Sequence, residues 1–115
     1  METKGKIWGK TDLIFSKNGI EIHRIKIKAG GFCSLHKHIH KSNVFFVESG
    51  LLKISVHKND YQLVDETILQ PGFQTTVGPE EFHKFEALEE TIAYEMYYTT
   101  LDPADIVRKD VGGVL

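Results

Sequence analysis

The chain has 115 residues, of which 41% are hydrophobic and 26% charged, and its formal net charge at pH 7 is -2. A chain of this length can bury a core unaided, so we expect one globular domain over residues 1–115. The small net charge excludes a general electrostatic attraction to nucleic acid or anionic membrane. Cys33 is the only cysteine, which excludes an intrachain disulfide and a zinc site built from several cysteines.

The N-terminal residues lack the apolar core of a signal peptide, and no apolar run is long enough to span a membrane. A lone cysteine also fits a reducing compartment. We therefore expect a soluble cytoplasmic protein with no membrane or nucleic-acid partner.

The first part of the chain predicts two strands joined by a tight turn. Residues 7–15 could form a short strand or arm, and the Lys-Asn-Gly sequence at 17–19 favours a hairpin turn because Asn-Gly accommodates positive φ angles. The next strand covers residues 20–28. Its apolar residues change parity after Ile22, which predicts a bulge or a bend at residues 23–24.

The chain up to Thr100 is predicted to form further short strands separated by turn residues. Residues 44–47 are a continuous apolar run, which is typical of a strand buried on both faces. Apolar and polar residues alternate in 52–57, which predicts a half-buried strand. The other predicted strands are the histidine-containing segment at 36–40 and residues 61–69, 75–77, 83–85 and 92–98.

The pattern changes after Thr100. Asp102 is a suitable N-cap and Pro103 suits the first helical position, which predicts a short helical turn through Val107. The last five residues, from Val111, are predicted to be a loose tail. Many short strands with turns at fairly even spacing indicate an all-β fold, a closed barrel or jelly roll, with a short C-terminal helical turn.

Three histidines, His36, His38 and His40, occupy alternating positions. In an extended strand alternate side chains point to the same side, so the three imidazoles can face one interior. Neutral imidazole is the commonest side-chain metal ligand, because it offers a lone pair without losing a proton. His83 lies on a distant segment that could return beside the first, and it would complete a histidine-lined pocket.

These residues resemble the first cupin motif, G(x)5HxH(x)4E(x)6G. The matching positions are Gly30, His36, His38, Asn43 and Gly50, and the spacing is complete. Asn43 stands where the motif has Glu. The resemblance implies a double-stranded β-helix with a metal ion inside the barrel.

A second segment resembles the second cupin motif, G(x)5PxG(x)2H(x)3N. Gly72 begins it and His83 holds the histidine position. Gly78 and Glu80 occupy the positions of the motif's Pro and Gly, and Ala87 replaces its Asn.

Within cupins, the chain resembles the type II mannose-6-phosphate isomerase domain. The resemblance is carried by residues 6–9 (Lys-Ile-Trp-Gly), 38–42 (His-Ile-His-Lys-Ser) and 105–108 (Asp-Ile-Val-Arg). It implies sugar-phosphate isomerisation and a homodimer. Two of the motif positions differ from that group, which usually has Gln at the position of His36 and Glu at the position of Asn43.

The cupin pattern implies metal ligands at His36, His38, Asn43 and His83. Three neutral imidazoles suit a single divalent ion of zinc, iron, nickel, manganese or copper, whereas a carboxamide is a weak ligand. Asn43 could therefore orient a bound water or a ligand instead. His40 is an alternative fourth ligand if the strand is straight; if it bends after His38, His40 faces substrate as the catalytic acid or base.

Asn in place of Glu removes a negative charge that would compensate a bound dication, which favours a small anionic substrate.

Three functions remain open. The chain could be a metal-dependent enzyme, with sugar-phosphate isomerisation as the version that the resemblance implies. It could be an Fe(II) dioxygenase with a three-histidine site, or a cupin that binds a sugar or a metal without catalysis.

The alternation of side chains along the strands predicts which other residues face the pocket. Glu48 has parity opposite to Asn43 and is predicted to face away from the pocket. Either Glu95 and Tyr97 or their neighbours line the pocket, depending on the phase of the last strand. His23 and His57 are predicted to lie at the surface or a strand edge, Cys33 is predicted to be buried, and Lys37, Lys41, Lys84 and Arg108 are charges near the barrel mouth. Apolar edges at 44–47 and 92–98 favour a homodimer.

Overall fold

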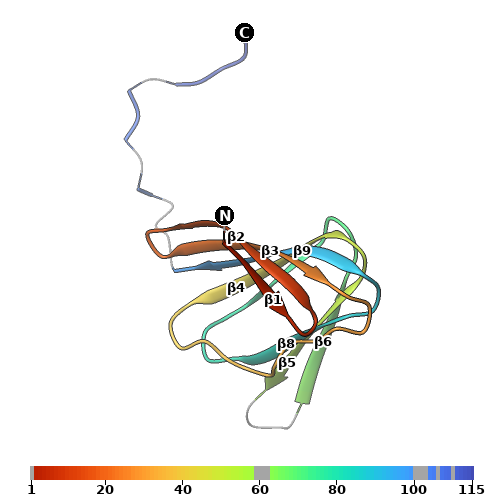
Figure 1. The fold of residues 1–115 in the computed structure, drawn as a ribbon. Coiled ribbons are helices and arrows are strands. Elements are labelled where there is room, and N and C mark those ends of the chain that lie inside the picture. The colour runs from red at the N-terminus through yellow and green to blue at the C-terminus, as the bar shows by residue number, and fades with distance from the viewer. Residues whose placement is uncertain (1, 59–62, 100–103, 106, 110) are drawn as a thin grey trace.

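The computed structural model describes residues 2–58, 63–99, 104–105, 107–109 and 111–115. Within this part of the chain nine strands form two antiparallel sheets, and the predicted all-β fold is confirmed (Figure 1). The strands are β1 (Glu2–Lys6), β2 (Gly9–Lys17), β3 (Ile20–Ile27), β4 (Ser42–Ser49), β5 (Leu52–Lys58), β6 (Leu63–Leu69), β7 (Gln74–Val77), β8 (Phe82–Ala87) and β9 (Thr91–Tyr98).

The larger sheet has the strand order β1-β2-β3-β9-β4-β7, and the smaller sheet has the order β6-β5-β8. The last strand, β9, lies between β3 and β4, so the chain returns to the middle of the larger sheet after building the smaller one. The two sheets face each other and enclose a common interior, as Figure 1 shows. This is a jelly-roll barrel, as the spacing of strands and turns predicts.

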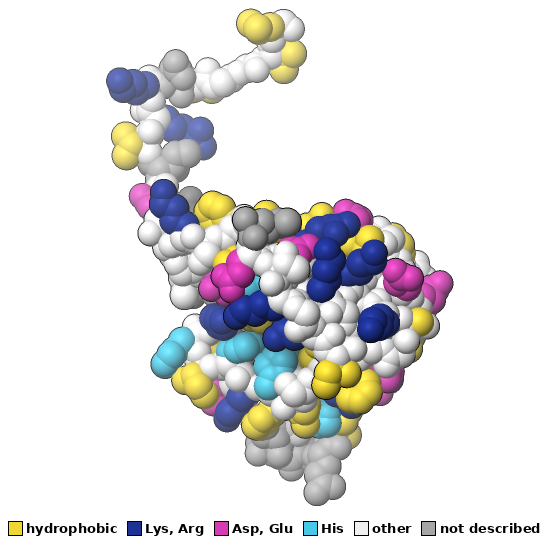
Figure 2. Space-filling model, viewed as in Figure 1, with side chains coloured by type: hydrophobic (Ala, Val, Ile, Leu, Met, Phe, Trp, Pro, Cys, Tyr) yellow, Lys and Arg dark blue, Asp and Glu magenta, His cyan; other side chains and the backbone are white. Residues whose placement is uncertain are grey.

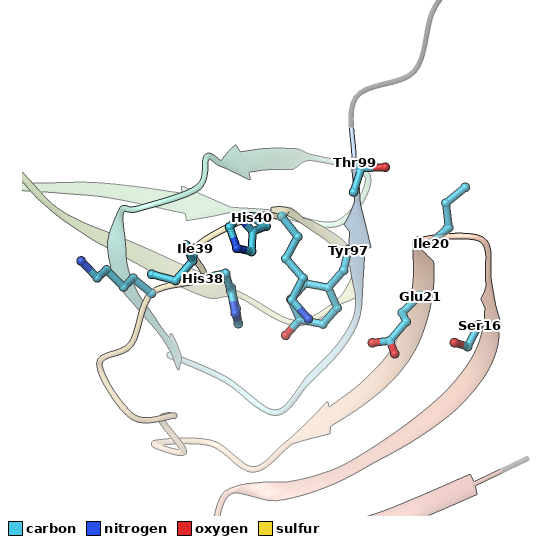
Figure 3. A pocket seen from close by; sticks show the side chains of 11 residues that line it. Ser16, Ile20, Glu21, His38, Ile39, His40, Tyr97 and Thr99 are labelled. Carbon is cyan, nitrogen blue, oxygen red and sulfur yellow. The ribbon is translucent and has the colours of Figure 1, made fainter.

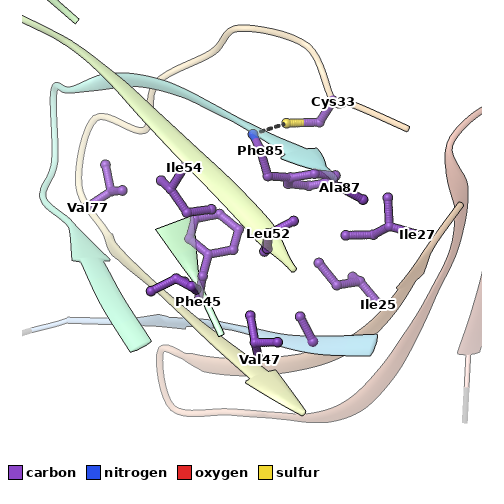
Figure 4. Close-up of a cluster of buried hydrophobic side chains, with 12 residues drawn as sticks. Ile25, Ile27, Cys33, Phe45, Val47, Leu52, Ile54, Val77, Phe85 and Ala87 are labelled. Carbon is purple, nitrogen blue, oxygen red and sulfur yellow. Dashed lines mark hydrogen bonds between the residues drawn. The ribbon is translucent and has the colours of Figure 1, made fainter. Parts of the chain in front are cut away.

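The hydrophobic core lies between the sheets (Figure 4). In β4 the inward residues Asn43, Phe45 and Val47 are buried, whereas Val44 and Phe46 are only partly buried. The prediction of a strand buried on both faces is therefore wrong for the outer face, which no second layer covers in the described structure. The buried hydrophobic side chains are Ile25, Ile27, Cys33, Phe45, Val47, Leu52, Ile54, Leu69, Val77, Phe85, Ala87 and Ala93.

The histidine-containing segment is extended but is not a strand. Between β3 and β4 it makes two isolated bridges to β8, Phe32 with Glu86 and His36 with His83. It then bends at residues 39–40. The segment pairs with β8 only locally because the bend carries the chain away into β4.

Two other features differ from the sequence-based expectations. β1 was not predicted, because its polar sequence Glu-Thr-Lys-Gly-Lys has no apolar alternation, and all its residues are exposed. The bulge lies in β2, between Leu13 and Phe15, rather than at residues 23–24 of β3, whose register against β9 is continuous. β3 is therefore regular: Ile25 and Ile27 are buried on its inner face, Ile20 and Ile22 lie on the opposite face, and the predicted bulge at residues 23–24 is wrong.

The end of the chain leads away from the two sheets (Figure 1). Residues 102, 103 and 106 of the predicted helical turn lie outside the described residues, and the described positions 104, 105 and 107 are not helical. Positions 59–62, which hold most of the predicted hairpin loop and the start of the next strand, also lie outside them. Among the described residues no helix has the length and apolarity needed to cross a membrane.

The apolar runs at 44–47 and 92–98 are not sheet edges. They belong to β4 and β9, and each of these strands has a hydrogen-bonded neighbour on both sides. The edge argument for a homodimer is therefore wrong, and the homodimer itself stays a prediction.

Gly50, the last residue of the first motif, provides a test of the fold. Its φ is +92°, and an added Cβ would collide with the carbonyl oxygen of Glu90 and with Thr91. We expect Gly50→Ala to lower the free energy of unfolding by about 3 kcal/mol or more, since the backbone must move as well as adopt a strained φ. The measurement is denaturant unfolding in the presence of a chelator.

Gly72→Ala is the matched control. Gly72 has a similar φ of +88°, but nothing lies within 4 Å of an added Cβ. Gly72→Ala should lower the free energy of unfolding only through the strained backbone conformation, by about 1–2 kcal/mol. Equal losses in the two variants would contradict the close approach at Gly50.

Candidate metal centre

A backbone bridge brings the two histidine segments together. The N–H of His36 donates to the carbonyl oxygen of His83 at 3.1 Å, and the N–H of His83 donates to that of His36 at 2.8 Å. Directly paired residues of antiparallel segments project their side chains to the same side. The ring centroids of His36 and His83 are accordingly 4.6 Å apart.

His38 completes a cluster with these two rings. Its centroid lies 5.1 Å from that of His36 and 5.5 Å from that of His83. One ligand nitrogen from each of the three residues lies within 4.8 Å of the others. The cluster could hold a metal ion, and the predicted convergence of the three imidazoles is confirmed.

Two of the histidines are oriented by backbone carbonyls. The Nδ1–H of His36 donates to the oxygen of Ser34 at 2.7 Å, and that of His83 donates to the oxygen of Glu81 at 2.9 Å. A proton on Nδ1 leaves the lone pair on Nε2 free, and such bonds typically fix the ring orientation of metal-ligating histidines. The two side chains are therefore held in the tautomer that a metal ion requires.

Three buried polar atoms lack a partner in the described part of the chain. They are Nε2 of His38, Nε2 of His83 and Oδ1 of Asn43. A buried polar atom without a hydrogen bond costs about 1–3 kcal/mol, so native structures keep few of them. All three belong to residues that the cupin pattern implies as ligands, and each atom can coordinate a cation through a lone pair. The residues present therefore fit a divalent cation.

Burial keeps two of the histidines neutral. It lowers the pKa of His38 to about 4, with smaller contributions from the positive charge of Lys41 and from the neighbouring histidines. Burial also lowers the pKa of His83. Because metal ions bind the deprotonated ring, both residues are ready to act as ligands at neutral pH.

The last strand brings a carboxylate to the edge of the site. Asn43 is 1% exposed, and its Nδ2 donates to Oε2 of Glu95 at 3.2 Å. Glu95 and Tyr97 face the interior, whereas Tyr94 points outward and donates to Glu48 at 3.1 Å. The phase of β9 is thus settled, and the exposed Glu48 faces away as its parity predicts. Glu95 is not one of the three converging residues.

Two hollows adjoin the cluster. An interior cavity of about 330 Å³ is lined by His36, Cys33, Glu95 and Tyr97, together with residues of β1, β2, β3 and β8. A groove at the mouth, of about 570 Å³, is lined by His38 and Tyr97 among others (Figure 3). Tyr97 separates the two, and its ring centroid lies 5.1 Å from that of His38.

His40 lies in the mouth groove, next to Ile39 and Lys41. It is exposed, and it follows the bend instead of converging with the other three histidines. The geometry is that of the bent alternative, and the role of His40 as acid or base stays a prediction.

The mouth of the site carries charges of both signs, because Glu21 also lines the groove and Lys37 pairs with Glu80 at 3.5 Å. Lys37 and Lys41 line the groove, and Nζ of Lys41 lies 3.8 Å from the ring centroid of Tyr97. Figure 2 shows histidine side chains gathered on one face beside lysine or arginine side chains. Lys84 instead lies 6.0 Å from the ring of Phe32, and Arg108 is exposed on the segment that leads away from the sheets.

His23 is a pocket residue that the sequence interpretation missed. It lines the interior cavity, its ring centroid lies 5.8 Å from that of Tyr97, and its Nε2 lies 3.3 Å from a carboxylate oxygen of Glu21. The prediction of a surface or strand-edge position is wrong. Its parity with the buried residues Ile25 and Ile27 was the signal that could have placed it inside.

Cys33 is buried, as predicted, and accepts a hydrogen bond from the N–H of Phe85 at 3.2 Å (Figure 4). Burial raises its pKa to about 11. The thiol is therefore protonated at neutral pH and behaves as a small apolar core residue.

No family model and no curated protein matches the sequence. Solved structures do match: KdgF from a Halomonas species has a TM-score of 0.69 at 15% identity, covering 81% of this chain and 80% of that chain. A cupin superfamily protein from Desulfitobacterium hafniense has a TM-score of 0.66 at 10% identity, covering 78% and 76%. The Cnp3 cupin domain of Schizosaccharomyces pombe has a TM-score of 0.69 at 12% identity, covering 79% and 64%. The chain therefore has the cupin fold.

The lowered pKa of His38 predicts an acid-sensitive fold. Between its unfolded value of 6.5 and its folded value of about 4, the unfolded chain binds more protons than the folded protein. The free energy of unfolding of the metal-free protein should therefore fall as the pH falls through this range. Denaturant unfolding at a series of pH values, with chelator present, measures the effect.

His38→Gln should reduce this pH dependence, because it removes the titrating ring. His57→Gln, on the partly exposed β5 residue outside both hollows, serves as the control and should leave the dependence unchanged. An identical acid response in His38→Gln and the wild type would show that burial does not hold this ring neutral.

Proposed function

We propose that this chain is a metal-dependent enzyme that acts on a small anionic metabolite. The observation that carries the proposal is the convergence of His36, His38 and His83 beside an interior cavity, with buried polar atoms that have no partner among the described residues. When bound there, a divalent ion would supply Lewis acidity toward an oxygen of the substrate. Asn43 is the proposed fourth residue, as a weak ligand or as the group that orients a water.

The charge of the site supports an anionic substrate. The three converging residues are all histidines, so no carboxylate within the cluster neutralises a dication. Lys37 and Lys41 line the groove through which a ligand would reach His38. A dication at the histidines and these two lysines, which outnumber the single glutamate Glu21 among the lining residues of the groove, would together favour an anion such as a carboxylate, an enolate or a phosphate.

The chain's own residues offer hydrogen bonds and proton transfer. Burial raises the pKa of Tyr97 above its usual range, and the neighbouring carboxylate of Glu95 acts in the same direction. Its hydroxyl therefore stays protonated and can donate to an oxygen of the substrate. His40, at the mouth, is the proposed acid or base, because it is exposed and can exchange protons with solvent.

Sugar-phosphate isomerisation is the specific form of this proposal, motivated by the resemblance to the type II mannose-6-phosphate isomerase domain. We expect the metal-loaded protein to convert mannose 6-phosphate or a related sugar phosphate, and we expect chelation to stop the conversion. Product formation measured with each candidate metal tests this form. Absence of turnover with every metal would exclude sugar-phosphate isomerisation but would not contradict the proposed metal site.

The metal itself is the more general test. We expect protein purified without a chelator or an affinity tag to contain a single divalent ion per chain by elemental analysis. His83→Ala should lose it, because removal of one of three strong ligands opens the site. His57→Ala should keep it. A metal-free wild type that stays empty on dialysis against zinc or iron would refute the proposal.

A second candidate is an Fe(II) dioxygenase. It is favoured by the all-histidine composition of the cluster. Oxygen consumption by the anaerobically iron-loaded protein, with a thiol or a diketone as substrate, would support it. Tight binding of a ligand without conversion would instead favour a sugar- or metal-binding protein without catalysis.

A further inference from the structure

Asn43 and Glu95 form a pair at the edge of the histidine cluster. They come from neighbouring strands, β4 and β9, and the amide nitrogen of Asn43 donates to the carboxylate of Glu95 at 3.2 Å. Asn43 is 1% exposed, so water cannot take the place of this bond. The conformation of the amide is therefore determined by its protein neighbours.

The chemistry of the pair fixes the direction of the amide. An ionised carboxylate only accepts hydrogen bonds, so the atom of Asn43 beside Glu95 must be the NH₂ group. The oxygen is on the other branch of the planar amide and points away from Glu95. This oxygen is the only atom of the amide that can bind a cation, and it is buried with no partner in the part of the chain that the structure describes.

The neighbours of Asn43 contact the histidine cluster. Tyr97, directly opposite Asn43 on β9, has its ring centroid 5.1 Å from that of His38. Phe45, the next inward residue on β4, has its ring centroid 6.2 Å from that of His83. The inward position of Asn43 thus has cluster-contacting neighbours both across the strand pair and along its own strand.

We infer that Glu95 is a positioning residue of the metal centre: it holds the Asn43 amide so that its oxygen, and not its nitrogen, is presented to the ion or to an ion-bound water. The inference rests on the proposed metal site. With the carboxylate absent the amide is free to rotate, and the NH₂ group, which repels a cation, can take the place of the oxygen. Glu95 thereby acts through its hydrogen bond to Asn43 and not as a ligand, since it is not one of the three converging residues.

The test measures metal affinity rather than turnover. Zn(II) binding is determined by competition with a chromophoric chelator, and Co(II) binding by its visible absorption, which reports the coordination geometry. We expect Glu95→Ala to weaken Zn(II) binding by about 10–100-fold, as is usual when a partner of a ligand is removed. Glu95→Gln should lie closer to the wild type, because its amide oxygen can still accept from Asn43.

Glu48→Ala is the matched control. Glu48 is a glutamate near the same strand pair, but on the outer face, where it contacts Arg24 and Tyr94. Its substitution should leave the Zn(II) dissociation constant unchanged. Thermal unfolding in chelator confirms that each variant is folded.

A double-mutant cycle separates positioning from a general structural effect. If Glu95 acts through Asn43, Glu95→Ala should cause no further loss of affinity in an Asn43→Ala background. Additive losses would overturn the inference, as would wild-type affinity in Glu95→Ala. Absence of Zn(II) binding in the wild type would overturn the metal centre as well, whereas unchanged binding in Glu95→Ala overturns the role of Glu95 alone.

Discussion

The centre depends on a single antiparallel bridge, the paired backbone hydrogen bonds between His36 and His83. Residues 47 positions apart in the chain cannot bring their imidazoles together unless the backbone register is fixed, and a shift by one residue would turn a side chain to the opposite face. The bridge lies in a short extended segment that, among the described residues, belongs to neither sheet and makes only isolated bridges to β8. Packing of Cys33 and Phe85 just before it, in the core, therefore helps to hold the register that the site needs.

The cluster illustrates a conflict between folding and binding. Burying imidazole nitrogens without partners destabilises the metal-free chain, and burial moves the pKa of His38 away from its ordinary value. The same desolvation keeps the rings neutral and the lone pairs free. A bound cation would satisfy these atoms and so stabilise the folded state by the free energy of binding. In the metal-free chain, burial of the apolar core between the sheets must offset this cost.

Sequence spacing predicted the barrel and the three converging histidines, because the motif fixes which residues face inward and which segments return together. It could not place His23 or Glu95. In β3 apolar residues occupy both faces, which hides the inward phase of His23, and the inward phase of β9 follows only from its pairing with β3 and β4. β1 escaped prediction for another reason: an exposed polar edge strand is held by backbone pairing to β2 and leaves no hydrophobic pattern. Local sequence patterns thus predict which faces are buried, but they do not predict residues whose position depends on how two strands pair.

The two hollows beside the cluster carry charges of both signs. The interior cavity is lined by Glu95 but also by Lys4 and Lys6, and the mouth groove is lined by Lys37 and Lys41 but also by Glu21. The charges of the lining residues therefore do not favour one side of Tyr97 over the other. The preference for an anion comes from the cluster itself, because three neutral histidines would leave the charge of a bound dication uncompensated.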